Sequence, residues 1–477
     1  MEKKLIDIVG NLNDFLWSNL LVFMLIGIGL YFTYKSRFMQ FRMVKEMFLV
    51  LKEGKTDAKK GLSPFQAFCI SMAARVGTGN ITGIAIAIAL GGPGAIFWMW
   101  IIALIGATSS FVESTLAQIY KVKDKGGFRG GPAYYMEKGL GKRWMGTLFA
   151  VLITLSFGLV FNAVQSNTIT VAFESSFGTD RLTLGIIMAI IFAVIIFGGI
   201  QRIAKASEYI VIVLAVLYIG VSLFITIINI TEVPNVLMLI FKSAFGLEQA
   251  LGGSFAAIIM NGIKRGLFSN EAGMGSAPNA AATAVTSHPV KQGLIQALGV
   301  LIDTGIICTS SAFIVLLSPV YKQTELSGIE LTQASLASHI GPWAPGFLAF
   351  MILLFAFSTL IGNYYYGETN IEFLNTNKIW LKLYKMGVLG MILFGSIAKV
   401  ELVWHIADLF MGLMVITNLI AILLLSKIAF AALNDYMKQK KAGKDPQFYT
   451  NSIKNTDGIE GWPTASTTKK NKGSMIG

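Results

Sequence analysis

Two stretches of the sequence decide the fold: AARVGTGN at residues 73–80 and FSNEAGMGSAP at residues 268–278. Each places paired glycines beside polar residues inside a long apolar run. Glycine lowers helix preference by about 1 kcal/mol relative to alanine, so two close glycines next to Asn or Ser favour an unwound segment. Unwound backbone at membrane depth is tolerated only where it lines a cavity or packs within protein. The two stretches therefore predict two broken helices.

The rest of the composition is that of a membrane protein. The chain has 477 residues, of which 54% are hydrophobic and 14% charged, and its mean hydropathy is +0.64. Soluble domains carry about 25% charged residues. The net charge of +13 comes from Lys and Arg in loops between apolar runs, which is typical of membrane proteins rather than of nucleic-acid binding. We expect an all-α integral membrane protein in a lipid bilayer, with no nucleic-acid partner.

About eleven apolar runs are long enough to cross roughly 30 Å of hydrocarbon as helices. None has the alternating pattern of a barrel strand. Because Met1–Asn13 is too polar for a signal-peptide core, we expect the first run to be an uncleaved span. The runs lie near residues 17–34, 64–90, 94–120, 145–173, 182–199, 209–230, 249–286, 293–320, 347–366, 379–397 and 403–428.

Loop charges orient these spans. Lys and Arg gather at residues 35–60, 121–143 and 202–205 and in the tail after residue 428, whereas the loop at residues 91–93 has no charge. The positive-inside rule then predicts an extracellular N-terminus and a cytoplasmic C-terminus in the cell membrane. Segments 235–245 and 329–340 resemble short amphipathic helices on the outer side. The polar tail from about residue 438 is predicted to be disordered.

The positions of the broken runs predict the organisation. Once the first span is set aside, each broken run begins a block of five spans. Because five is odd, the second block crosses the membrane in the opposite direction to the first. Interrupted helices at matching places of two inverted halves indicate the central site of a transporter. The predicted parts are residues 1–63 (N-terminus, extra span and basic loop), 64–230 (first repeat, broken at 76–80), 231–248 (extracellular amphipathic segment), 249–430 (second repeat, broken at 268–276) and 431–477 (cytoplasmic tail).

Four motifs carry a family resemblance: VGTGNI at 76–81, GGPGA at 91–95, GGPAYY at 130–135 and SNEAGMGSA at 269–277. They resemble the alanine/glycine:cation symporter family, from about Phe65 to Asp435. The resemblance implies a LeuT-type fold and import of alanine, glycine or a related amino acid, coupled to Na⁺. Proton coupling stays open as a rival. A channel or receptor is disfavoured by the paired breaks, and an enzyme by the lack of a nucleophile–base pair or metal signature. We expect no organic cofactor.

The substrate carboxylate needs hydrogen-bond donors. A break at Gly77 frees the N–H groups of Thr78 and Gly79, and the resemblance to LeuT-type transporters implies that these two amides hold the carboxylate. The alternative is a tight helix crossing that needs small residues. Asn162 and Gln165 share one helix face and are either substrate contacts or helix–helix hydrogen bonds. The second break adds Phe268, through its carbonyl, and Ser269.

The coupling ion needs oxygen ligands. By resemblance, the carbonyls of Ala73 and Val76 and the hydroxyls of Ser358 and Thr359 would form a sodium site. The alternative for the two hydroxyls is hydrogen bonding to the carbonyl one turn earlier in their own helix. A second sodium at Asn80, beside Ser269, is a further hypothesis.

Asn363 lies one turn after Thr359 and, by the LeuT-type alignment, faces the substrate side chain. Some family members have an aromatic residue there, so we hypothesise tolerance for a larger polar side chain, such as that of glutamine or asparagine; the alternative is a packing role. Arg75 and Glu271 flank the two breaks and could pair. Other ionisable residues within spans are candidates by default, namely Glu113, Lys264, Arg265, Asp303 and Asp408. Cys69 and Cys308 are expected to be buried free thiols.

Overall fold

The computed structural model describes residues 2–53, 61–124, 127–197, 213, 216–246, 254–322, 325–454 and 457–464. Parts of the predicted basic loops, at residues 54–60 and 200–208, lie outside the described residues. So do the end of the predicted span 182–199 and the starts of the spans near 209 and 249.

Within the described residues, six helices are long and apolar enough to cross a membrane, or eight if each of two bent pairs is one span. A mostly helical architecture with several apolar spans is thereby confirmed, whereas the count of eleven and the inverted repeat stay predictions. The six are α7 (Ala95–Ile119), α9–α10 (Arg143–Phe177), α16–α17 (Pro289–Leu316), α19 (Ala344–Leu374), α20 (Lys378–Ile397) and α21 (Val400–Lys441); the bent pairs are Pro64–Arg75 with Gly79–Gly91, and Val216–Ile228 with Val233–Ala244.

Shorter elements complete the described fold. The predicted amphipathic segments are confirmed as helices α13 and α18. The elements are α1 (Glu2–Leu16), α2 (Val22–Lys35), α3 (Met39–Arg42), α4 (Val44–Glu53), the antiparallel strands β1 (Val122–Asp124) and β2 (Gly127–Arg129), α8 (Pro132–Lys138), α11 (Arg181–Ile196), α13 (Val233–Ala244) and α18 (Gly328–Ile340). Short 3₁₀ turns lie at Pro319–Lys322 and Thr450–Ser452.

The first predicted break is confirmed. Helix α5 (Pro64–Arg75) begins with Pro64 after a capping box between Ser63 and Gln66, and its helical winding ends at Arg75. Val76 is extended, with φ −82° and ψ 92°. Winding resumes in a π-helical turn at Gly79–Gly83 and continues as α6 (Ile84–Gly91), so the two halves meet at an angle of 51°.

The second predicted break is confirmed as well. Helix α14 (Phe255–Asn270) ends at Asn270, and six residues separate it from the start of α15 (Ala277–Ala281). Glu271, Gly273 and Gly275 have φ values of +57°, +82° and +85°. Glycine adopts this left-handed backbone without steric cost, which explains why glycines stand at this break.

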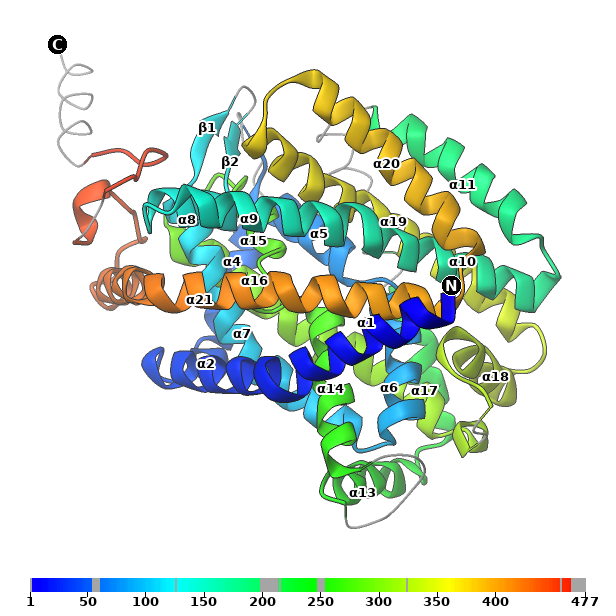
Figure 1. The fold of residues 1–477 in the computed structure, drawn as a ribbon. Coiled ribbons are helices and arrows are strands. Elements are labelled where there is room, and N and C mark those ends of the chain that lie inside the picture. The colour runs from blue at the N-terminus through cyan, green and yellow to red at the C-terminus, as the bar shows by residue number, and fades with distance from the viewer. Residues whose placement is uncertain are drawn as a thin grey trace.

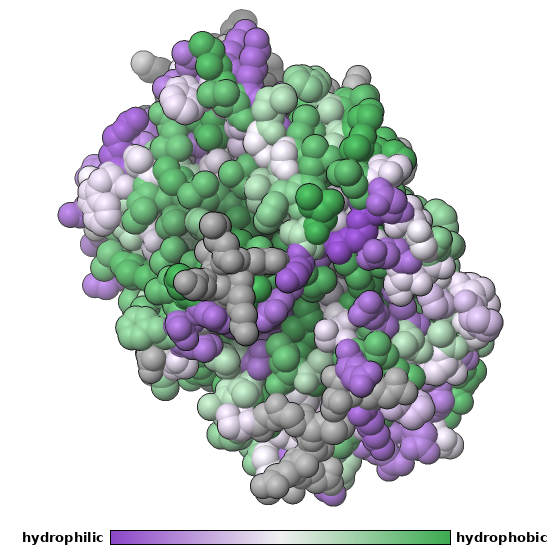
Figure 2. All heavy atoms as spheres, turned by 45° about the vertical axis from the view of Figure 1, so that its right-hand side comes forward, coloured by the Kyte–Doolittle hydropathy of each residue, from purple (hydrophilic) through white to green (hydrophobic). Residues whose placement is uncertain are grey.

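The broken helices lie among the long ones. Helices α14 and α16 pack on α7, and α19 and α20 pack on α10. We call the end of the bundle where α21 stops the tail side; it carries the β1–β2 hairpin, α8 and the tail, at the left of Figure 1, opposite the N-terminus. Hydrophobic side chains cover much of the surface in Figure 2, and exposed Ile186, Ile190 and Val194 line one face of α11. Such a surface suits lipid rather than water.

The prediction of a disordered tail is wrong for the described residues 442–454 and 457–464. These residues fold back onto the loop before α16, where the Phe448 N–H donates to the Ser287 carbonyl at 2.9 Å. The polar composition of the tail suits this placement because its partners are polar groups of the loops.

Candidate functional site

The hydroxyl of Thr359 faces the first break. Its Oγ1 lies 2.9 Å from the carbonyl of Ala73 and 3.2 Å from that of Val76, and at 3.1 Å from the Phe355 carbonyl it can also make the predicted alternative, back-bonding within its own helix. Ala73 lies in the last turn of α5 and Val76 directly after it, and α19 supplies the hydroxyl that meets both carbonyls. Ser358, the other predicted ligand, donates to the Phe355 carbonyl at 2.9 Å, which is the alternative of local back-bonding.

Only glycine fits at residue 77. A Cβ atom there would overlap Thr359 Oγ1 and lie 3.0 Å from Gln165 Oε1. The Gly77 N–H donates to Asn80 Oδ1 at 2.9 Å, which closes the break as a tight turn. Small size therefore allows α19 and α10 to approach the freed backbone from two sides.

Gln165 reaches the break from α10. Its Oε1 accepts a hydrogen bond from the Thr78 N–H at 3.2 Å, at the amide predicted to hold a carboxylate. Asn162, on the same face, donates from Nδ2 to the Gly158 carbonyl of its own helix at 2.9 Å. The structure thus brings Gln165 to the break and engages Asn162 within its own helix.

Asn80 joins the two broken helices. Its Nδ2 lies 2.8 Å from Ser269 Oγ on α14 and 2.6 Å from Asp303 Oδ1. Ser269 Oγ in turn donates to Asp303 Oδ2 at 2.8 Å, and Cys308 Sγ lies 3.3 Å from Asn80 Nδ2. All four side chains are buried. We call them the Asn80 cluster.

A π-helical turn explains how Asp303 and Cys308 both reach this cluster. The turn spans Asp303–Cys308, and its hydrogen bonds join residues five apart, so both ends face the same way. The sequence showed Asp303 only as an ionisable residue within a span. An Asp and a Cys five apart inside an apolar run were the only local signal.

The donor set of the cluster suits a hard monovalent cation. Three of its four side chains, a carboxylate, a hydroxyl and an amide, offer oxygen atoms, which hard ions prefer, and the fourth is the thiol of Cys308. Within the described ranges, no group of three His, Cys, Asp or Glu residues could hold a metal ion. The partly positive NH₂ group of Asn80 now lies among these acceptors.

Glu113 of α7 anchors the second break. Its two carboxylate oxygens accept hydrogen bonds from the N–H groups of Gly273 at 3.2 Å and Gly275 at 3.1 Å. Asn418 of α21 donates to Glu113 at 2.8 Å and to the Gly273 carbonyl at 2.9 Å. The unwound segment is therefore tied to two long helices. The sequence marks Glu113 only as an ionisable residue within a span, because its partners lie on distant segments.

The proposed pairing of Arg75 with Glu271 is wrong. Arg75 contacts the Gln296 carbonyl and Ser110 Oγ, each at 3.4 Å. Glu271 turns back within its own loop and accepts a hydrogen bond from Ser276. In the part of the chain that the structure describes, no ion pair joins the two residues. Arg75 points instead toward α7 and α16, which pack beside α5.

A row of aromatic rings covers the first break. A Cβ at Gly79 would lie 3.0 Å from Phe268 Cδ1, so this ring rests directly on the glycine. The Phe268 ring centroid is 4.8 Å from that of Phe161 and 4.7 Å from that of Trp404. Three helices thus contribute rings over the amides that are predicted to bind the substrate. Phe268 contributes its ring there, in addition to the carbonyl that is predicted to contact the substrate.

A buried charge cluster lies beside these rings, one turn of α14 further from the tail side. Arg265 pairs with Asp408 of α21, and its guanidinium lies 4.6 Å from the Trp404 ring centroid. Lys264 Nζ lies 3.6 Å from the same carboxylate. Two cations share one buried anion, so this contact holds α14 against α21 on the side away from the tail.

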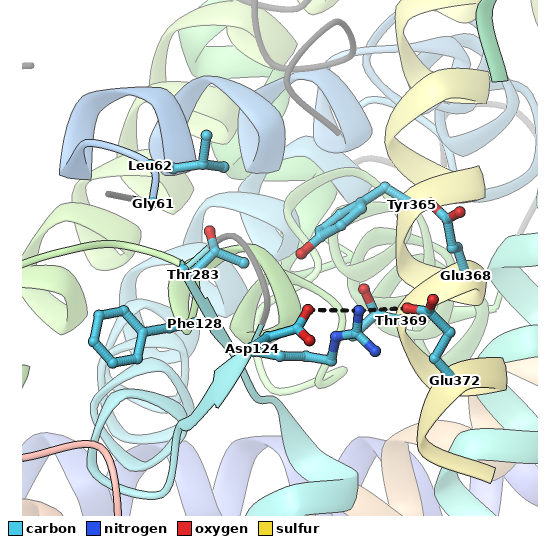
Figure 3. Close-up of a pocket in the computed structure, with 11 residues that line it drawn as sticks. Gly61, Leu62, Asp124, Phe128, Thr283, Tyr365, Glu368, Thr369 and Glu372 are labelled. Atoms are coloured by element: carbon cyan, nitrogen blue, oxygen red, sulfur yellow. Dashed lines mark hydrogen bonds and ion pairs between the residues drawn. The ribbon is translucent and has the colours of Figure 1, made fainter. Parts of the chain in front are cut away.

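A cavity of about 260 Å³ lies on the tail side. It lies between the start of α5, the end of α15, the hairpin and α19, and its lining includes Leu62, Thr283, Tyr365 and Thr369 (Figure 3). At its edge, Arg129 of β2 pairs with Asp124 at 2.9 Å and with Glu372 of α19 at 2.5 Å. We call the Arg129–Glu372 contact the hairpin bridge.

Two groups in the site keep free hydrogen-bonding capacity. Asn363 is buried one turn from Thr359, and neither its Oδ1 nor its Nδ2 has a hydrogen-bond partner among the described residues. The same holds for Thr78 Oγ1. Buried polar atoms normally find partners. These groups are therefore available to a polar ligand.

Broken helices, buried polar groups at both breaks and a cavity on one face are features typical of a membrane transporter. The family model of the sodium:alanine symporter family matches residues 2–450. The chain belongs to this family, which confirms the resemblance found in its motifs.

Proteins of similar sequence carry names that fit this family. The chain is 69% identical to the probable sodium/glutamine symporter GlnT of Bacillus subtilis, over 98% of both chains. It is 37% identical to the sodium/alanine symporter AgcS of Methanococcus maripaludis, over 91% of this chain and 98% of that one. A crystal structure of the Eremococcus coleocola manganese transporter is similar in fold, with a TM-score of 0.51 at 12% identity over 89% of this chain and 87% of that one.

Proposed function

We propose that this chain is a sodium-coupled symporter that imports a small neutral amino acid by alternating access. It lies in the cell membrane with the N-terminus outside and the tail side in the cytoplasm, and its core is a five-plus-five inverted repeat after one extra helix. The observation that carries the proposal is the meeting of the two broken helices beside their breaks: Asn80 contacts Ser269 of α14, while Thr359 faces the carbonyls of Ala73 and Val76.

The amino acid binds between the breaks in this proposal. Its carboxylate takes the N–H groups of Thr78 and Gly79, in exchange for the Gln165 oxygen that Thr78 now holds. Its ammonium faces the Phe268 carbonyl. The Phe268 ring rests on Gly79, so the ring must shift to admit a substrate and can return to cover it.

Sodium ions bind at the two oxygen clusters. The first is formed by Ala73, Val76, Thr359 and Ser358, whose hydroxyl must leave the Phe355 carbonyl to join. The second is the Asn80 cluster, where rotation of the amide replaces NH₂ with Oδ1. Asp303 supplies the negative charge of this second site. Because a carboxylate can also carry a proton, proton coupling remains the rival candidate.

The side chain of the substrate faces Asn363, which favours glutamine or asparagine beside alanine and glycine. The observation is the free capacity of the buried Asn363 amide to pair with a second carboxamide. The relative of 69% identity is named for glutamine. We expect Asn363→Trp to abolish glutamine uptake and to retain alanine uptake; intact glutamine uptake would contradict the assignment.

One experiment tests the whole proposal. The purified protein in proteoliposomes is given an inward Na⁺ gradient or an inward pH gradient separately, with labelled alanine, glycine or glutamine outside. We expect accumulation only with the Na⁺ gradient, and exchange of preloaded amino acid in counterflow. Accumulation with the pH gradient alone indicates the proton-coupled rival, and flux that runs down without counterflow indicates a channel.

A further inference from the structure

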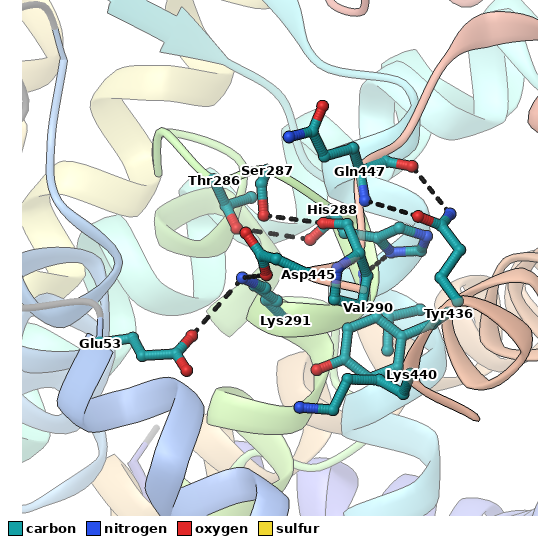
Figure 4. Close-up of polar contacts among 12 residues, drawn as sticks. Glu53, Thr286, Ser287, His288, Val290, Lys291, Tyr436, Lys440, Asp445 and Gln447 are labelled. Carbon is teal, nitrogen blue, oxygen red and sulfur yellow. Dashed lines mark hydrogen bonds and ion pairs between the residues drawn. The ribbon is translucent and has the colours of Figure 1, made fainter. Parts of the chain in front are cut away.

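The described residues after α21 dock across the tail side. We call residues 445–454 and 457–464 the strap. The Ser287 backbone and hydroxyl bind the strap on two sides, accepting from the Phe448 N–H at 2.9 Å and donating to the Pro446 carbonyl at 3.0 Å. Lys291 pairs with Asp445 at 2.8 Å, and Figure 4 shows this lysine between Asp445 and Glu53. The first half of the strap is therefore fixed to the loop that follows the second broken helix.

The second half of the strap docks on the end of α7. The Trp462 indole N–H donates to the Gln118 carbonyl at 2.8 Å, and its ring packs edge-on against Phe448 with centroids 5.1 Å apart. Lys138 of α8 pairs with Glu460 at 2.5 Å. A Cβ at Gly461 would lie 2.7 Å from both Cγ and the carbonyl oxygen of Lys121. The strap thus lies tightly against the loop between α7 and β1.

Lys121 connects the strap to the hairpin. Its ammonium lies 4.5 Å from the Trp462 ring centroid and 4.1 Å from that of Phe128 in β2. It also donates to Gln118 Oε1 at 2.8 Å and to the Ala284 carbonyl at 3.1 Å. Burial lowers the pKa of Lys121 to about 7, which reflects how fully the two rings and their neighbours exclude water from this ammonium.

Phe128 is followed directly by Arg129, the cation of the hairpin bridge. Arg129 reaches Glu372 of α19 across the edge of the tail-side cavity (Figure 3). The contacts therefore form a continuous series: Trp462 of the strap, Lys121, Phe128 of the hairpin, and the bridge to α19. A displaced Trp462 removes one of the two rings that hold Lys121, and with it a support of the hairpin.

We propose that the strap is a latch on the tail side, which holds the hairpin bridge closed over the cavity when docked and allows the cavity to open when released. The latch acts at the tail side, which is the end of the bundle opposite the Arg265–Asp408 pair. Its effect on import rests on the proposed transport function, whereas the docking itself does not.

The test measures access to the cavity. Thr283, which lines the cavity, is replaced by cysteine. The purified full chain is reconstituted in proteoliposomes so that its tail side is accessible from outside, and the rate of labelling with a membrane-impermeant maleimide is measured. The parental chain, whose Cys69 and Cys308 are buried, gives the background. We expect Gly461→Val, which forces the strap away from Lys121, to raise the labelling rate several-fold. Trp462→Ala should do the same by removing the ring. Lys454→Ala, an exposed strap position, is the matched control.

The outcomes separate the two proposals. Faster labelling in both strap variants, with the control unchanged, supports the latch even if no amino acid is transported. Equal labelling rates in all variants overturn the latch while leaving Na⁺-driven uptake by the parental chain untouched. If a single strap variant is poorly folded, as judged by its elution on size exclusion, the other variant decides.

Discussion

Replacement of Thr359 by valine tests the first sodium site with little change of shape. The substitution removes one hydroxyl that lies 2.9 Å from the Ala73 carbonyl and 3.2 Å from the Val76 carbonyl. Interactions of a buried polar group with a charged partner contribute about 1.5–3 kcal/mol. Since 1.4 kcal/mol corresponds to about tenfold in affinity, we expect the Na⁺ concentration for half-maximal uptake to rise by roughly 10- to 100-fold.

The assay is initial uptake of labelled amino acid into proteoliposomes over a series of Na⁺ concentrations. Thr359→Ser, which keeps the hydroxyl, should stay close to the parental curve. Thr417→Val on α21 is the matched control, because Thr417 is buried and hydrogen-bonds only to the Leu413 carbonyl of its own helix at 3.0 Å among the described residues. An unchanged Na⁺ dependence in Thr359→Val, or equal effects in both valine variants, would refute the reasoning.

Three further predictions follow from the buried contacts. Gly77→Ala should lower uptake at least tenfold, because its Cβ would overlap Thr359. Gly220→Ala, with open space around it, should leave uptake unchanged. Equal uptake rates in the two variants would contradict this. Asp303→Asn, which removes the charge of the Asn80 cluster, should raise half-maximal Na⁺ by about tenfold or more in the same assay; an unchanged value excludes Asp303 as a ligand. Asp408→Asn should cost about 3–5 kcal/mol, because two buried cations lose their partner. Thermal unfolding in detergent should show a larger loss than for Lys264→Met, which leaves Arg265 paired; the reverse order contradicts the assignment.

The breaks could be predicted from the sequence because their cause is local. Paired glycines beside polar residues weaken a helix wherever they stand, and α5 and α14 end at Arg75 and Asn270, as those patterns indicate. The contact of Thr359 with the Ala73 and Val76 carbonyls was predicted too, but through the resemblance to LeuT-type transporters rather than from spacing.

Contacts between distant segments could not be predicted. Asn80 and Asp303 are 223 positions apart, and only packing of the whole bundle brings them together. The same holds for Glu113 and the glycine amides of the second break. The pairing of Arg75 with Glu271 was inferred from their positions at the breaks, but position along a chain does not fix where a long side chain points. The docked strap was missed because its composition resembles that of a disordered tail.

The Gln165 oxygen at the Thr78 amide has a consequence for speed. At Thr78 the proposed pocket presents an N–H that is already hydrogen-bonded, so a substrate carboxylate would replace that hydrogen bond instead of adding one. The net gain is then only the difference between a charged and a neutral acceptor, about 1 kcal/mol. Such an exchange limits how tightly cargo is held, and a carrier that must release its cargo in every cycle benefits from moderate affinity and rapid turnover.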